Sequence, residues 1–223
     1  HPVAHSFPTR RSSDLDRNAR YLPHRVHDTS PPDPVPVGQL GRTYLDSLQH
    51  YLRAFQDKEW SGLLEAGRLA RAVRQIGRTA HACPLGGHLR PNRMDIPGTA
   101  RDLADVSRYV EPAALDSILT QGDMLYIQGY TAIPPAELTG HARVGALPAA
   151  MLDAAAAAGA FTVLSAAGRN AQAPDRQTAD VVLDSQWELG DTTVPLPGYD
   201  VPLLPPSGFM AAAIYWALVL AAG

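Results

Sequence analysis

The spacing of apolar residues predicts helices in the first third of the chain and buried strands in the second half. Between Gln39 and Phe55 apolar residues recur every three or four positions, which is typical of one face of a helix. The same spacing returns between Trp60 and Ile76, and Gly77 follows at a position where helices often end in a left-handed residue. These stretches therefore predict two successive helices.

Three short apolar runs predict strands that are buried on both faces of a parallel sheet. They are DMLYIQ at residues 123–128, FTVLS at 161–165 and DVVLD at 180–184. An Ala-rich helix is predicted over residues 144–158, and Gly159 ends it. The order strand, helix, strand predicts a right-handed crossover unit, so the fold class is α/β.

The remaining segments give weaker or shorter elements. Residues 79–83 are few and polar for a strand, and a long loop follows them. Residues 111–119 predict a short helix with Pro112 in its first turn. The apolar stretch 209–222 is shorter than the roughly 20 residues that cross a bilayer, so it predicts a buried helix and no membrane partner.

Composition narrows the class of protein. Apolar residues make up 45% of the chain and aromatic residues only 7%, so the core must be mostly Ala, Leu and Val, which favours helices packed on a parallel sheet. A net charge of -3 with dispersed arginines offers no basic surface, so nucleic acid is not an expected partner. The single cysteine, Cys83, cannot form an internal disulfide, which favours a reducing, cytoplasmic location.

The first 37 residues are expected to lie outside the folded domain. Residues 5–15 read HSFPTRRSSDL, which matches the conceptual translation of a common sequencing-library adapter, so residues 1–15 are set aside. A basic disordered tail and a transit peptide are the alternatives. Residues 16–37 include SPPDPVP, whose prolines support no helix or strand, and are expected to be disordered or upstream translation. The predicted domain spans residues 38–223.

Three segments of the second half together resemble the sugar isomerase (SIS) domain, in particular its small bacterial phosphosugar-binding members. They are GDMLYIQGYTA, AGAFTVLSAAGRN and TADVVLDSQWELGDTTVPLPG. The third matches best, because the family's Ala-Asp-Val-Val strand and its following Gly-Asp recur at residues 179–184 and 190–191. The resemblance implies a three-layer sandwich with a doubly wound, mostly parallel, flavodoxin-like sheet and N-terminal helices.

The resemblance also implies a phosphosugar site with altered loops at the carboxyl ends of the strands. Where the family has Ser-x-Ser-Gly, this chain has GYTA, so one hydroxyl is missing and Thr131 supplies another. Where the family has a first loop Gly-x-Gly-x-Ser, the serine is replaced by His88, which can still donate to a phosphate. The implied ligand-binding residues are Gly86, Gly87, His88, Gly129, Tyr130, Thr131, Ser165, Asp191 and Ser207.

Each of these polar residues also has a purely structural interpretation. Thr131 is either a phosphate ligand or a turn residue at a strand end. Ser165 ends a buried strand where ligands of open α/β folds gather, and a satisfied strand-end hydroxyl is the alternative. Ser207 precedes the last apolar helix and is first of all an N-cap, with a ligand role as the alternative.

Metal and catalytic residues are not assigned from the sequence. A histidine–cysteine set near residues 81–88 has nonspecific spacing, so no metal or cofactor is expected; its members are His81, Cys83 and His88. Three loop carboxylates could serve acid–base chemistry or simply be solvated; they are Asp184, Glu188 and Asp191.

Three functions remain open. The first is binding of a phosphosugar or related carbohydrate derivative, with isomerase activity undecided, by a homodimer that associates through the last helix. The second is a degenerate SIS module that no longer binds phosphosugar and serves in dimerisation or regulation. The third is an amino-sugar-phosphate lyase, whose catalytic glutamate would be Glu137 or Glu188.

Overall fold

The computed structural model describes residues 35–84, 103–105, 112–128, 142–167, 179–187, 191–196 and 202–223. The chain divides into two compact units. The larger unit comprises Leu48–Leu189 and Pro206–Gly223 and holds the sheet; the smaller comprises His1–Ser47 and Gly190–Pro205. The single domain expected over residues 38–223 remains a prediction.

The sheet of the larger unit has five parallel strands in the order β2-β1-β3-β4-β5. Their bounds are β1 Ala80–Pro84, β2 Ala104–Asp105, β3 Met124–Gln128, β4 Phe161–Ala166 and β5 Val181–Asp184. This is the flavodoxin-like order, in which the chain changes winding direction between β1 and β3. The predicted doubly wound parallel sheet is confirmed.

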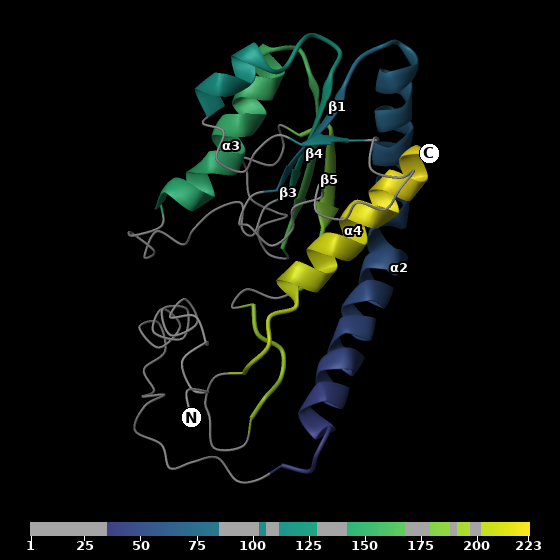
Figure 1. Cartoon of the computed structure of the whole chain (residues 1–223), viewed down its shortest axis with the longest axis vertical. Coiled ribbons are helices and arrows are strands. Elements are labelled where there is room, and N and C mark those ends of the chain that lie inside the picture. The colour runs from purple at the N-terminus through teal and green to yellow at the C-terminus, as the bar shows by residue number, and fades with distance from the viewer. Residues whose placement is uncertain are drawn as a thin grey trace, which may run out of the picture. The chain divides into compact units, whose positions relative to one another are not determined.

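Helices cover both faces of this sheet (Figure 1). The elements are α2 Gln39–Gln75, the 3-10 helix η2 Pro112–Ser117, α3 Ala142–Ala157 and α4 Ser207–Ala222. Alternate residues of β3 enter two separate cores, with Tyr126 among residues of α2 and α4 and Leu125 among residues of η2 and α3. Because β3 is buried on both faces, its sequence is a continuous apolar run that ends at Gln128. The three-layer arrangement is confirmed.

The prediction of two N-terminal helices is wrong, because α2 is one helix of 37 residues. The polar segment 56–59, QDKE, separates the two apolar stretches in the sequence but contains no glycine or proline that would end a helix. Gln56, Asp57 and Lys58 are exposed, so these residues continue the helix on its solvent side. Gly77 adopts a φ of 76° after the end of the helix, as its position predicted.

Residues 79–83, which are weak as a strand in sequence, correspond to an interior strand. β1 pairs with β2 on one side and with β3 on the other. β2 was not predicted, and its two residues are too few to give a sequence pattern. The predicted short helix at residues 111–119 is the 3-10 helix η2.

Helices α2 and α4 pack closely near the end of α4. A Cβ atom at Gly67 would lie 2.5 Å from the Cβ of Ala221, so a glycine is needed at this contact. Arg71 and Arg74 of α2 donate hydrogen bonds to the carbonyls of Ala221 and Ala222. Basic side chains thus bind the negative end of the α4 dipole. No helix among the described residues is long and apolar enough to cross a membrane.

The smaller unit contains the first turns of α2 and two short extended segments. The Tyr44 hydroxyl donates a hydrogen bond of 2.8 Å to the Pro205 carbonyl. Val194 and Leu203 form an antiparallel bridge. The hydrogen bond joins α2 to the second segment, and the bridge joins the two segments to each other.

Candidate functional site

The carboxyl ends of the parallel strands form one edge of the sheet, where open α/β folds bind ligands. Within the described residues, β3 and β4 bring two polar side chains together there. Gln128 is the register partner of Ser165, and both side chains are buried. Gln128 Nε2 donates a 2.6 Å hydrogen bond to the carbonyl of Ala211 in α4. Ser165, a predicted ligand residue, is therefore next to a residue that holds α4 in place.

Helix α4 directs its N-terminus toward this edge. Gln128 contacts Ala211, and two residues earlier in β3 the Tyr126 ring lies 6.5 Å from the Tyr215 ring, measured between centroids. Successive contacts thus move backward along β3 and forward along α4, so the two elements are antiparallel. The positive end of the α4 dipole therefore lies at the carboxyl edge.

The expectation that Ser207 caps α4 is wrong. The N-cap is Pro206, whose carbonyl accepts from the Met210 amide and whose side chain makes no capping hydrogen bond. Ser207 is instead the first residue of the helix and is buried. The first turn of α4 contains no acidic residue, so no carboxylate of that turn neutralises the helix dipole. Such a helix end is suited to an anion.

The other predicted ligand residues belong to the smaller unit or lie outside the described residues. Asp191 belongs to the smaller unit, where it is buried with a φ of 51°. There it acts on Tyr44, whose pKa is raised above its ordinary value by burial and also by the Asp191 charge. The remaining predicted ligands lie outside the described residues; they are Gly86, Gly87, His88, Gly129, Tyr130 and Thr131.

Some of the candidate acid–base residues lie within the described residues and others lie outside them. Asp184 ends β5, and its Oδ1 accepts a 2.8 Å hydrogen bond from the Gln186 amide. Glu137 and Glu188 lie outside the described residues. The described carboxyl edge therefore offers hydrogen-bond donors and a helix dipole as its main chemistry, which suits anion and polyol binding.

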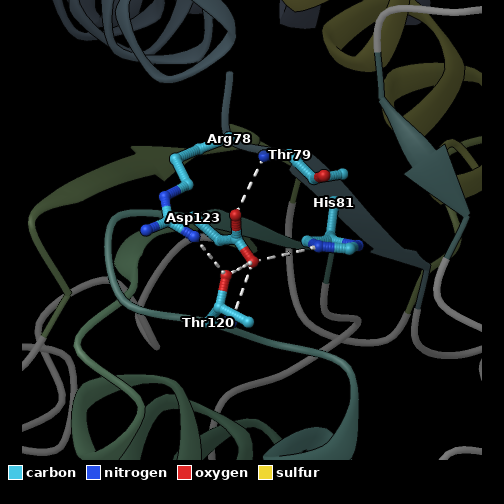
Figure 2. A network of polar contacts seen from close by, with 5 residues as sticks. All are labelled: Arg78, Thr79, His81, Thr120 and Asp123. Atoms are coloured by element: carbon cyan, nitrogen blue, oxygen red, sulfur yellow. Dashed lines mark hydrogen bonds and ion pairs between the residues drawn. The ribbon is translucent and has the colours of Figure 1, made fainter. Parts of the chain in front are cut away.

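The opposite, amino edge of the sheet contains a polar network that Figure 2 shows. Asp123 lies just before β3, and its Oδ1 accepts a 2.9 Å hydrogen bond from the Thr79 amide at the start of β1. Its Oδ2 accepts from the amide and the hydroxyl of Thr120, at 2.8 Å and 2.9 Å. Burial opposes ionisation of Asp123, but these hydrogen bonds prevail and its pKa is lowered below the ordinary value. These hydrogen bonds link the start of β1 to the start of β3.

His81 lies beside the network and is buried. Its Nε2 is 3.7 Å from Asp123 Oδ2 and makes no hydrogen bond with the described residues. Burial lowers the pKa of His81 against the raising effect of Asp123, so the imidazole is neutral near neutral pH. No group of three or more His, Cys, Asp or Glu side chains suited to a metal ion occurs within the described ranges.

A second aspartate links another pair of strands, β4 and β5, in a similar way. Asp180, just before β5, accepts hydrogen bonds from the amide and the hydroxyl of Thr162 in β4, at 2.7 Å and 3.0 Å. The Asp180 amide in turn donates to the Thr162 hydroxyl. The aspartates that open the predicted strands are thus structural links between strands.

Sequence reasoning missed Gln128 at the carboxyl edge and Tyr126 two residues before it. Each occurs within the apolar run of β3, where tyrosine is a common strand residue and glutamine marks the strand end. A usable signal was the polar side chain that closes an otherwise continuous apolar strand. Only the register with β4 shows that Gln128 and Ser165 are neighbours.

Comparison with known proteins gives similarity at the level of fold. No protein-family model and no curated protein sequence matches the chain. Among solved structures, a phosphoheptose isomerase from Francisella tularensis matches with a TM-score of 0.60 at 6% identity, covering 84% of this chain and 98% of that one. The sugar isomerase domain of an RpiR transcription factor from Sphaerobacter thermophilus matches with a TM-score of 0.48 at 15% identity, covering 83% and 90%. The likeness to the phosphoheptose isomerase shows that the chain has the fold of the sugar isomerase (SIS) domain.

Proposed function

We propose that this chain binds a sugar phosphate or a related carbohydrate derivative at the carboxyl edge of its sheet. The observation that carries the proposal is the N-terminus of α4, whose positive dipole end has no acidic residue in its first turn and lies over the end of β3 beside Ser165. Backbone N–H groups and the helix dipole bind the phosphate, while buried polar side chains bind the sugar. The fold shared with a phosphoheptose isomerase supports this class of ligand.

A ligand screen is the first test of this proposal. Hexose, heptose and amino-sugar phosphates are titrated calorimetrically, beside the same sugars without phosphate and inorganic phosphate alone. A ligand present at a hundred times its dissociation constant should stabilise the protein by about 2.7 kcal/mol in thermal unfolding. Failure of every sugar phosphate to bind would favour a degenerate module that no longer binds phosphosugar.

The role of α4 is tested with a charge placed in its first turn. In Gly208→Asp the new carboxylate interacts favourably with the helix dipole, which should stabilise the free protein, but it repels an anionic ligand. Gly208→Asn has nearly the same shape without the charge and is the matched control. We expect the aspartate variant to bind sugar phosphate about tenfold more weakly than the asparagine variant. Equal affinities of the two variants would remove the α4 N-terminus from the site.

We also propose that the protein is a cytoplasmic homodimer that associates through the outer face of α4. Phe209 is 44% exposed and Leu220 is 76% exposed, and Trp216 between them is half-buried. Spacings of seven and four residues place these side chains on one side of the helix. Sedimentation at micromolar concentration should show a dimer for the wild type and a monomer for Leu220→Glu. A monomeric wild type would contradict the proposal.

A further inference from the structure

The core beneath α4 contains two buried hydroxyl groups that have no hydrogen-bond partner among the described residues. They are Tyr126 Oη in β3 and Ser185 Oγ, which follows β5. A buried hydroxyl without a partner costs stability, roughly 1–3 kcal/mol. A group that lowers stability is often retained because it has a function. The two hydroxyls can be compared directly because they lie on the same face of the sheet.

The face is established by the alternation of side chains along the strands. Tyr126 and Val163 both belong to the core formed with α2 and α4, and Ser165 lies two residues beyond Val163 on the same side of β4. Ser185 lies between Leu183 and Trp187, which belong to that core as well. All three hydroxyls therefore lie on the α4 side of the sheet.

The Tyr126 hydroxyl extends along the sheet toward its carboxyl edge. The backbone partner of Tyr126 in β4 is Val163, yet its hydroxyl comes near Ser165, two residues closer to that edge. Burial raises the pKa of Tyr126 above its ordinary value, and the Ser165 side chain opposes that rise without reaching hydrogen-bond geometry. The phenol is therefore neutral and retains its proton for donation.

From this geometry we infer that Tyr126 is a positioning residue that acts through Ser165 in the ligand-bound protein. Its O–H donates to Ser165 Oγ, and the Ser165 O–H then donates to an uncharged oxygen of the ligand, a hydroxyl or a carbonyl. The pair thus selects the polyol part of the ligand, while the N-terminus of α4 binds the anionic part. This inference rests on the proposed function.

The arrangement explains why an unpaired hydroxyl is retained in the core. Among the described residues the donor has no partner in the free protein, and it gains one only when Ser165 is oriented by the ligand. A hydroxyl of this kind favours binding at the expense of the stability of the free protein. Its removal should therefore change stability and affinity in opposite directions.

The test compares Tyr126→Phe with Ser165→Ala, their double variant and Ser185→Ala. Tyr126→Phe deletes only the hydroxyl, so the melting temperature of the free protein should stay the same or rise. Its affinity for the sugar phosphate that binds the wild type should fall five- to tenfold, while the affinity for inorganic phosphate alone should not change. The double variant should bind no more weakly than Ser165→Ala, because the two hydroxyls act in series.

Ser185→Ala is the matched control, since it also removes a buried hydroxyl without a partner from the same face. We expect it to leave affinity unchanged. The inference is overturned if the wild type binds a sugar phosphate and Tyr126→Phe binds it equally well, or if Ser185→Ala loses as much affinity as Tyr126→Phe. If the wild type binds no sugar phosphate, the proposed function itself fails, which is a separate result.

Discussion

The two edges of the sheet differ in their carboxylates and hydroxyls, although one buried group at the amino edge, His81 Nε2, also has no partner among the described residues. At the amino edge, both oxygens of Asp123 accept hydrogen bonds, and Asp180 is bonded to the amide and the hydroxyl of Thr162. Near the carboxyl edge, the Tyr126 and Ser185 hydroxyls have no partner among the described residues, and the first turn of α4 contains no acidic residue.

This difference separates groups that hold the fold from groups left for a ligand. A carboxylate that accepts several hydrogen bonds contributes to stability and has little capacity left for another molecule. A buried hydroxyl without a partner lowers stability and retains its full bonding capacity. Substitutions at the amino edge should therefore affect unfolding, and substitutions at the carboxyl edge should affect binding.

The largest effect on stability is expected from Asp123→Ala. The change leaves the Thr79 and Thr120 amides and the Thr120 hydroxyl without their charged acceptor, which should lower the free energy of unfolding by about 3 kcal/mol. Urea unfolding measures this loss. Asp116→Ala in η2, which removes an exposed carboxylate, is the control and should change stability by less than about 0.5 kcal/mol. A loss at Asp123 no larger than the loss at Asp116 would contradict the difference proposed between the two edges.

Asp180→Ala should give a smaller loss of the same kind. Its carboxylate also accepts two hydrogen bonds, but Asp180 is exposed, so water can replace it at the Thr162 amide. We expect a loss of about 1 kcal/mol in the same urea experiment. Equal losses at Asp180 and Asp123 would show that burial of the acceptor does not determine how much the free energy of unfolding falls.

The smallest effect is a pH dependence that arises at His81. Because burial lowers the pKa of His81 in the folded protein, the unfolded chain binds a proton more readily below about pH 6.5, and stability falls as the pH drops below that value. Asp123, with a lowered pKa, adds a separate loss below about pH 4. His81→Gln should flatten the first decline and leave the second.

Melting temperatures between pH 7 and 3 separate the two steps. The matched comparison is His50→Gln, which changes an exposed histidine of α2. A first decline that is as steep in His81→Gln as in the wild type would show that His81 is not its source.

The strands that sequence predicts well are those buried on both faces. β3, β4 and β5 appear as continuous apolar runs because helices cover the sheet on both sides. β1 is equally interior, but His81 and Cys83 face the core and weaken the apolar pattern. The length of α2 was missed because a solvent-exposed polar stretch looks the same whether it is a loop or one side of a helix.

The candidate site was less predictable than the fold, for a physical reason. Whether a hydroxyl has a hydrogen-bond partner depends on its three-dimensional surroundings. The residue types of Tyr126 and Ser185 alone do not reveal it. Ser165 was found because a strand end can be located from sequence, and its pairing with Gln128 required the register. The Ser207 prediction failed because capping depends on backbone geometry, and Pro206 occupies the N-cap.

The edges of the described sheet bear on how the protein avoids aggregation. The outer strand β5 has four residues, so it offers only a short row of unpaired backbone groups. After β5 the chain turns at Gln186, whose φ of 64° is incompatible with a continuing strand. Lys58 donates to the Gln186 side-chain oxygen, and Gln186 Nε2 donates to the Glu59 carboxylate, so α2 fixes this turn. At the β5 edge a neighbouring molecule therefore has little exposed ladder on which to add a strand, and this is a common protection against edge-to-edge polymerisation.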